Sequence, residues 1–263
     1  MEVARVNILG VGVSAVNMAQ ALSLIASWIA AQRPNYVCVS NVHSIMSCQK
    51  DAELRTIHNR VGLVTPDGMP LVWLSRRAGY RHVERVYGPD LLLALCAYGL
   101  PHGYRHFFYG GGIGVAQRLA ERLQARFPGL QVAGAFTPPF GTLSAAEDDR
   151  ITRLLAHSGA HIIWVGLGMP KQERWMAAHT ALLPQVLIGV GAAFDFHSGM
   201  KKQAPLWMQR YGLEWLFRLL SEPRRLWQRY LTTIPLFIAL IAAQQLGLRR
   251  YQLSDEPLTQ DRA

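Results

Sequence analysis

Short apolar runs alternate with longer amphipathic stretches along most of the chain. The apolar runs end at residues typical of turns, and a helical pattern follows most of them. Strands are predicted at Val6–Val13, Tyr36–Ser40, Val61–Thr65, Arg105–Tyr109, Gln131–Phe136, His161–Val165 and Val186–Val190. Strands separated by helices of about 10–15 residues are typical of parallel βαβ units, which place helices on both faces of a sheet. The fold class is therefore predicted to be α/β, with a Rossmann-like parallel sheet.

The predicted helices have recognisable ends. They are expected over roughly Val16–Gln32, from about Pro70, over Val115–Phe127 and up to about His157. Ser144 and Glu147 have the spacing of a capping box, in which each side chain bonds the backbone N–H of the other residue. Pro170 lacks an N–H that the first residue of a helix does not need, so it is predicted to begin a further helix.

The pattern changes at about Lys201, where glycine becomes rarer and tryptophan, arginine and leucine become more frequent. Two parts are therefore predicted: a Rossmann-like catalytic core over residues 1–200 and a basic, amphipathic, helical appendage over residues 201–263. Within the appendage, Ile234–Ala243 is an apolar run that contains Pro235. A transmembrane helix needs about 20 apolar residues, so this run is predicted to be too short to cross a membrane. It is expected to lie in a membrane interface, with packing on the core as the alternative.

The charge is concentrated in the appendage. The whole chain has a net charge of +10, and half of its residues are hydrophobic, which excludes a disordered or collagen-like protein. Residues 201–250 contain nine basic and two acidic residues, so they contribute +7 of that total. This concentration indicates contact with an anionic partner, which is the phosphate of a substrate, a nucleic acid or an anionic membrane leaflet. A merely solvated surface is the alternative.

The cysteines and histidines do not predict a metal site. The three cysteines show no C-x-x-C spacing, which argues against a disulfide framework and indicates a reducing compartment. Two histidine pairs are four residues apart, but each pair spans a glycine-containing loop that leads into a predicted strand. No metal and no other cofactor is therefore expected.

Glycines follow two of the predicted strands, at the edge of a parallel sheet where ligands bind. Gly110 and Gly111 follow one strand, and Gly166 and Gly168 follow another. Helix N-termini next to such turns bind phosphate through free backbone N–H groups. Neither turn completes the G-x-G-x-x-G fingerprint, and the sequence contains no P-loop motif, so a nucleotide or sugar phosphate is favoured over NAD. Turns needed only for packing are the alternative.

Four polar residues at the same edge are candidates for chemistry. Asp67 follows a strand in a Pro-Asp-Gly turn and is a candidate general base for a substrate hydroxyl, with a local Asx turn as the alternative. Asp195 lies between two phenylalanines just after a strand. Lys171 and Gln172 occupy the first turn of a predicted helix. Lys171 is suited to neutralising a phosphate, and Gln172 to bonding a sugar hydroxyl or phosphate oxygen; the alternative is that Lys171 and the neighbouring Glu173 are solvated charges of the first helical turn.

Seven segments, taken in order, resemble the WecG/TagA/CpsF family of bacterial glycosyltransferases. Each segment alone is weakly specific, whereas their joint order is highly specific. They extend from about Asn35 to Arg225. The segments are Val39-Ser40-Asn41-Val42-His43-Ser44, Pro66-Asp67-Gly68, Glu84-Arg85-Val86-Tyr87-Gly88-Pro89-Asp90, Tyr109-Gly110-Gly111, Val165-Gly166-Leu167-Gly168-Met169-Pro170-Lys171-Gln172-Glu173, Gly191-Ala192-Ala193-Phe194-Asp195-Phe196 and Leu213-Glu214-Trp215-Leu216-Phe217-Arg218.

The resemblance implies transfer of a sugar, with inversion, from a UDP-sugar to a saccharide linked to undecaprenyl diphosphate, with no metal required. The family's proposed catalytic base matches Asp67, and its polar residue near the sugar matches Asn41. Its motif arginine matches Arg85, and its first-turn glutamine matches Gln172.

The resemblance also implies residues on the nucleotide side. The acid near the uracil falls on Asp195, and the aromatic residue of a Pro-Pro loop falls on Phe140. The arginines of the appendage that close over the diphosphate match Arg218 and Arg225. A third arginine of the family falls on Gln228, so this chain departs from the family pattern there.

The Asp-Gly-Met-Pro-Leu-Val-Trp segment that begins at Asp67 looks most like the xanthan or acetan type of exopolysaccharide enzyme. The resemblance therefore implies glucose transfer in a β-1,4 linkage. Transfer of N-acetylmannosamine or its uronic acid is the alternative within the family. A nucleic-acid-binding protein and a non-catalytic assembly subunit are the alternatives outside it, and no nucleic acid is expected as a partner. The expected location is the cytoplasmic face of the inner membrane, as a peripheral protein, and a homo-oligomer is left open.

Overall fold

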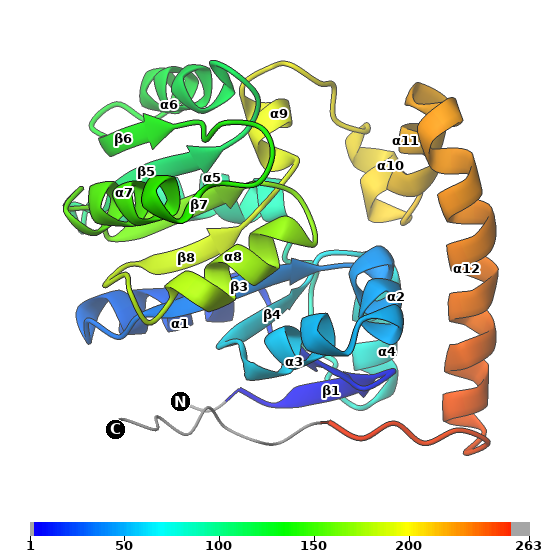
Figure 1. The fold of residues 1–263 in the computed structure, drawn as a ribbon. Coiled ribbons are helices and arrows are strands. Elements are labelled where there is room, and N and C mark those ends of the chain that lie inside the picture. Colours follow the sequence, from blue (N-terminus) through cyan, green and yellow to red (C-terminus); the bar gives the residue numbers. More distant parts are fainter. Residues whose placement is uncertain (1–2, 254–263) are drawn as a thin grey trace.

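The computed structural model describes residues 3–253, except for the side chains of Arg225 and Arg229. Its centre is a six-stranded parallel sheet with the strand order β4-β3-β8-β7-β5-β6 (Figure 1). The strands are β3 (Asn35–Ser40), β4 (Leu63–Pro66), β5 (Arg105–Gly110), β6 (Gln131–Phe136), β7 (Ile162–Gly166) and β8 (Val186–Gly189). The α/β fold with a parallel sheet, predicted from the alternation of strands and helices, is confirmed.

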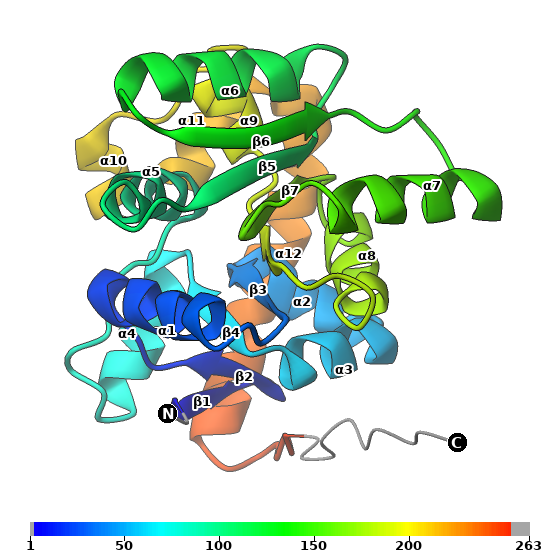
Figure 2. The ribbon, with the colours of Figure 1, turned by 90° about the vertical axis from the view of Figure 1, so that its left-hand side faces the viewer.

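Alternate strand residues point to opposite sides of this sheet, so both of its faces are apolar. Helices cover both faces. Val37, for example, belongs to one hydrophobic cluster and its neighbour Cys38 to the other. One cluster contains residues of α1 (Met18–Ala30), α5 (Gly88–Gly99), α6 (Val115–Arg126) and α9 (Ala193–His197). The other contains residues of α2 (Val42–Lys50), α3 (Ala52–Arg60), α4 (Met69–Arg77), α7 (Ala145–Ala156) and α8 (Lys171–His179). Figure 2 shows α1 and α5 on one side of the sheet and α3 and α8 on the other.

The helix ends agree with the sequence signals in one case and differ in another. The predicted capping box of α7 is confirmed: Ser144 N donates to Glu147 Oε2 at 3.0 Å, and Glu147 N donates to Ser144 Oγ at 3.3 Å. Pro170 is not the first residue of α8 but its N-cap. The reason is that its carbonyl oxygen accepts the bond from Arg174 N at 3.2 Å, which makes Lys171 the first helical residue.

The predicted strand Val6–Val13 is wrong, because this segment is a hairpin of two short strands. Strands β1 (Arg5–Ile8) and β2 (Val11–Ser14) pair antiparallel in a separate two-stranded sheet. Leu9 and Gly10 form the turn with φ values of 51° and 80°. Two positive φ angles give a turn whose twist matches that of the flanking strands. Leu9 is fully buried in spite of its place in the turn, so the turn does not interrupt the apolar run in the sequence.

The appendage consists of α10 (Leu206–Arg210), α11 (Glu214–Ser221) and α12 (Pro223–Gln245), which run alongside the core (Figure 1). The apolar run Ile234–Ala243, expected to be too short to cross a membrane, is part of a longer element, so its expected place in a membrane interface stays a prediction. The run lies within a 23-residue helix that continues through Pro235. Leu226–Gln245 is the one stretch in the described part of the chain that is long and apolar enough, by length and composition, to span a membrane. Because most of its residues are not buried, α12 offers apolar surface outside the protein core.

Candidate active site

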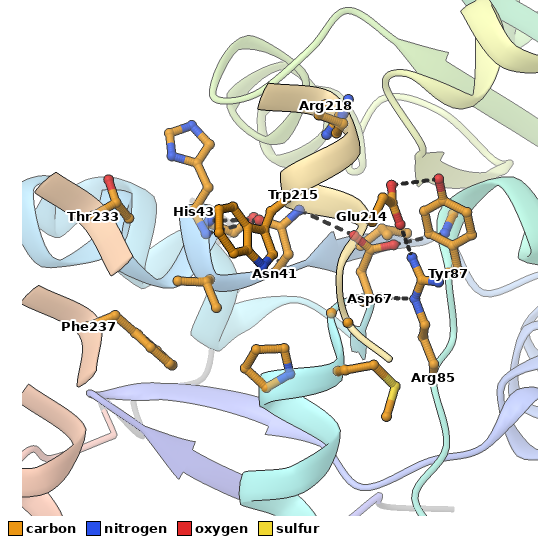
Figure 3. A pocket seen from close by; sticks show the side chains of 18 of the residues that line it. Asn41, His43, Asp67, Arg85, Tyr87, Glu214, Trp215, Arg218, Thr233 and Phe237 are labelled. Carbon is orange, nitrogen blue, oxygen red and sulfur yellow. Dashed lines mark hydrogen bonds and ion pairs between the residues drawn. The ribbon is translucent and has the colours of Figure 1, made fainter. Parts of the chain in front are cut away.

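A pocket with a volume of about 990 Å³ lies at the carboxyl ends of strands β3, β4 and β8. The turns after β3 and β4, the start of α8 and the turn after β8 form one side of it. Residues of α11 and α12 form the other side (Figure 3). The appendage therefore completes the pocket, whose size is at the upper end of the range for small-molecule sites.

Asn41 begins α2 and lies beside Asp67 because their strands are neighbours in register, with Ser40 opposite Pro66. Its Oδ1 accepts hydrogen bonds from the backbone N–H groups of His43 at 3.0 Å and Ser44 at 3.3 Å. These two bonds fix the orientation of the amide. As a result Nδ2 points to Asp67 and donates to its Oδ2 at 3.2 Å.

Asp67 is held by two neighbours that also line the pocket. Its Oδ1 accepts from Gly88 N, the first residue of α5, at 3.1 Å, and its Oδ2 accepts from Asn41. Both partners are distant in sequence, so the local Asx turn considered as an alternative is not formed. The pKa of Asp67 is raised to about 6, because burial and the nearby charge of Glu214 raise it by more than Arg85 and the two hydrogen bonds lower it. The side chain is half-buried and lines the pocket, so a substrate proton can reach it.

Arg85 connects Asp67 to the appendage. Its Nε donates to the backbone oxygen of Asp67 at 2.6 Å, its Nη1 donates to Gln209 Oε1 at 3.3 Å, and its Nη2 forms an ion pair with Glu214. Tyr87 donates through its hydroxyl to the same Glu214 carboxylate at 2.9 Å, and the guanidinium lies 3.8 Å from the Tyr87 ring centroid. All three nitrogens of Arg85 therefore bond protein groups, as Figure 3 shows for Glu214 and Asp67.

Gln172 and Glu173 form a buried pair at the pocket wall, with exposures of only 5% and 1%. Gln172 Nε2 donates to Glu173 Oε1 at 2.8 Å. Gln172 Oε1 and Glu173 Oε2 are buried atoms without a hydrogen-bond partner among the described residues. Burial raises the pKa of Glu173 to about 7. The pair therefore presents Gln172 Oε1 as an acceptor for a ligand hydroxyl or N–H group, and Glu173 is not the solvated charge that its helix position suggests.

Arg218 lines this pocket from α11, and its guanidinium carbon lies 6.0 Å from the Phe196 ring centroid. Arg218 and Phe196 also line a second pocket of about 490 Å³, which contains Lys201 and Lys202. Two adjoining cavities thus share one arginine. The side chain of Arg225, the other arginine proposed for the diphosphate, lies outside the described residues.

Several residues proposed for the nucleotide side do not line the large pocket. Gly168 lines it, whereas Gly110, Gly111 and Gly166 do not. A Cβ on Gly110 would lie 2.6 Å from the backbone of Gly166, and a Cβ on Gly111 or Gly166 would lie within 3 Å of a neighbouring side chain, so these glycines allow close packing. This is the packing role considered as their alternative.

Three other residues proposed for the nucleotide side lie apart from the large pocket. Lys171 Nζ donates to Gly141 O at 2.8 Å, next to the fully exposed Phe140. Asp195 lies 3.6 Å from Lys201 Nζ, so it adjoins the second pocket. The roles proposed for these residues remain predictions.

The sequence reasoning did not single out Glu214, Tyr87, Gln209 or Glu173 as site residues. Residues 201–250 contain nine basic residues and only two acidic ones, of which Glu214 is one. An acidic residue in such basic surroundings is a signal for an ion pair. Gln209 carries no comparable signal. Within residues 3–253, no group of three or more His, Cys, Asp or Glu residues is arranged to hold a metal ion. The expectation that no metal is required remains a prediction.

Comparisons with known proteins agree with the geometry. The model of the WecG/TagA/CpsF glycosyl transferase family matches residues 6–251. A Bacillus spizizenii protein is 29% identical over 207 residues, which cover 78% of each chain. A Bacillus subtilis protein is 28% identical over 203 residues, which cover 77% of each chain. A Staphylococcus aureus protein is 25% identical over 250 residues, which cover 94% of this chain and 96% of its own. All three carry the name N-acetylglucosaminyldiphosphoundecaprenol N-acetyl-beta-D-mannosaminyltransferase.

Proposed function

This chain belongs to the WecG/TagA/CpsF family of glycosyl transferases, and we propose that it transfers N-acetylmannosamine from UDP to N-acetylglucosaminyl-diphosphoundecaprenol. The sugar and the acceptor are taken from the names of the three relatives. Those names favour the N-acetylmannosamine alternative over glucose, which was the first expectation from the sequence, and they give no support to an exopolysaccharide product.

One observation carries the proposal: a carboxylate and an arginine from different parts of the chain line the same pocket. Asp67 has a pKa of about 6, so it is mostly ionised at neutral pH and still basic enough to accept a proton. Arg218 lines the same cavity from the appendage. A base and a cation around one cavity suit a reaction in which a hydroxyl attacks while an anion leaves.

The proposed reaction is a single displacement. Asp67 takes the proton of an acceptor hydroxyl while the oxygen of that hydroxyl forms a bond to the anomeric carbon of the donor. The bond between that carbon and the UDP oxygen breaks, and UDP leaves with the electron pair, so the configuration inverts. Arg218 stabilises the negative charge that develops on the diphosphate. Asn41 holds Asp67 in place through its bond to Oδ2, and Gln172 accepts a hydrogen bond from the sugar.

The proposed location is the cytoplasmic face of the inner membrane, with the appendage against the bilayer. The three cysteines are free and buried, which suits a reducing compartment. The net positive charge of residues 201–250 suits the anionic leaflet, and α12 supplies apolar surface. Charge and apolar burial together are expected to hold the protein at the membrane as a peripheral enzyme.

The test uses purified full-length protein, EDTA, and a panel of UDP-sugars with acceptors that carry either N-acetylglucosamine or glucose on a diphosphate lipid. We expect product only with UDP-N-acetylmannosamine and the N-acetylglucosamine acceptor. Asp67→Asn should lower turnover by at least about a thousandfold while UDP binding, measured by calorimetry, persists. Asp149→Asn, at an exposed ion pair on α7, is the matched control. Full activity of Asp67→Asn would overturn the assignment of Asp67 as the base, and absence of transfer by the wild-type protein would favour a non-catalytic subunit.

A further inference from the structure

One wall of the active-site pocket is apolar and belongs to α12. The residues of α12 that line it recur at helical spacing from Leu226 to Gln245, a stretch of about 30 Å along the helix axis. The α12 residues towards its C-terminal end that line the pocket are Ile234, Phe237, Ile238, Ile241 and Ala242. The pocket therefore extends beyond the polar groups around Asp67, along the length of this helix.

The side facing α12 also carries apolar residues, beside His43 of α2 and Arg77 of α4. Val42 of α2 and Met69, Trp73 and Leu74 of α4 line the pocket there. Trp73 is 52% exposed, so the aromatic ring is not simply part of the core. We call the space between these residues and α12 the α12 groove. A sugar or nucleotide has no hydrocarbon with which to cover such a surface, so the two ends of the pocket suit different parts of a ligand.

The helix is held as a fixed wall. Gln244 accepts a hydrogen bond from Leu9 N at 3.0 Å and donates one to Asn7 O at 2.9 Å, which ties the end of α12 to the β1–β2 hairpin. Phe237 is buried against the core. Leu231 and Leu236 are exposed by 67% and 44% and do not line the pocket, so α12 has a second apolar side that faces away from the groove.

We propose that the α12 groove binds the first isoprene units of the polyprenyl chain of the acceptor. The inference rests on the proposed function, since it assumes an acceptor with a polyprenyl chain. A diphosphate-linked sugar placed near Asp67 and Arg218 leaves its hydrocarbon end to pass along α12. The chain then leaves the groove beside a helix whose other side is also apolar and suited to a bilayer. The groove thereby seats the acceptor for attack.

The experiment compares acceptors that carry the same diphosphate-linked sugar on one, three or eleven isoprene units. We expect the kcat/KM of the wild-type protein to rise at least about tenfold from one to three units, because even partial burial of a second unit gains that factor. The rise should then level off as the groove fills. Comparing each variant with the wild type in the same detergent cancels the effect of micelle partitioning.

Two variants of α12 provide a matched pair. Ile238 lines the groove and is 62% exposed, whereas Leu236 points away from it and is 44% exposed, so neither substitution opens the core. In Ile238→Gln the ratio of kcat/KM between three units and one should fall to near one, and in Leu236→Gln it should equal that of the wild type. Ala242→Phe, which adds bulk to the groove wall, should lower this ratio as well.

The outcomes separate the two proposals. Transfer to every acceptor with no dependence on chain length, or the same ratio in Ile238→Gln and the wild type, would overturn the α12 groove and leave the proposed function standing. Absence of transfer to any acceptor would overturn the proposed function itself. Unfolding midpoints of the three variants, measured by thermal melts, identify any loss that comes from misfolding.

Discussion

The burial of Asp67 is expected to set the pH at which the enzyme loses activity, and the charge on Glu214 to shift it further. Asp67 must be ionised to act as a base, and its pKa of about 6 is above the ordinary value of 3.8. With that pKa about 90% of the molecules carry an ionised Asp67 at pH 7 and about 10% at pH 5. The kcat/KM of the wild-type protein should therefore fall about ninefold between these two values, with an apparent pKa near 6.

Two substitutions should move this acidic limb in opposite directions. Glu214→Gln removes a negative charge that raises the pKa of Asp67, and it also leaves Arg85 without its anionic partner, so the limb should move down by about one pH unit. Asn41→Ala removes the hydrogen bond to Oδ2 that lowers the pKa of Asp67, so the limb should move up. Both variants should also lose activity at every pH, because each loosens a contact of the site.

The assay is UDP release at subsaturating donor between pH 4.5 and pH 8 at constant ionic strength, with unfolding midpoints recorded at each pH. The position of the limb, rather than the height of the plateau, is the measured quantity. An acidic limb of Glu214→Gln at or above that of the wild type would refute the electrostatic reasoning. So would a limb of Asn41→Ala that moves to lower pH.

Two further predictions concern buried carboxyl groups. Because the pKa of Asp67 is raised in the folded protein, its ionisation destabilises the fold at pH 7, and this cost disappears only below about pH 3, where the carboxyl is protonated in both states. Asp67→Asn should therefore raise the free energy of unfolding by more at pH 7 than at pH 3, by up to about 3 kcal/mol, as measured in urea; equal gains at both pH values would contradict this. Glu173→Ala should lower kcat/KM about tenfold because the Gln172 amide loses the partner that orients it, whereas Glu173→Gln, which keeps an acceptor oxygen, should restore most of the activity. Equal losses in the two Glu173 variants would show that the pair only fills space.

The sequence was sufficient for the parts of the site that depend on strand ends. Asn41 and Asp67 each follow a strand, and adjacent parallel strands bring such residues to one edge of the sheet. The contact between Arg85 and Glu214 could not be predicted in this way, because it joins residues 129 positions apart through a helix whose placement depends on packing. Local pattern carries no information on that placement.

Two fold features were missed for a related reason. Leu9 forms a turn inside an apolar run, so hydrophobicity concealed the break between β1 and β2. The extent of α12 could not be seen because only its second half is continuously apolar, while its first half includes basic residues. In both cases the pattern of hydrophobic residues reports burial or lipid-like surface, and it does not report where the backbone turns or continues.

The position of Arg218 depends on the same contact that connects Arg85 to the appendage. Glu214 and Arg218 are four residues apart on α11, so their side chains lie on neighbouring parts of one helix face. When Arg85 and Tyr87 bind Glu214, that face is turned towards the core, and Arg218 is brought to the pocket that contains Asp67. The base and the cation are thus positioned through one set of contacts, because Arg85 also bonds the backbone oxygen of Asp67. This arrangement explains why Arg85 is suited to a positioning role: its three nitrogens are already used to hold the two reacting sides of the pocket together.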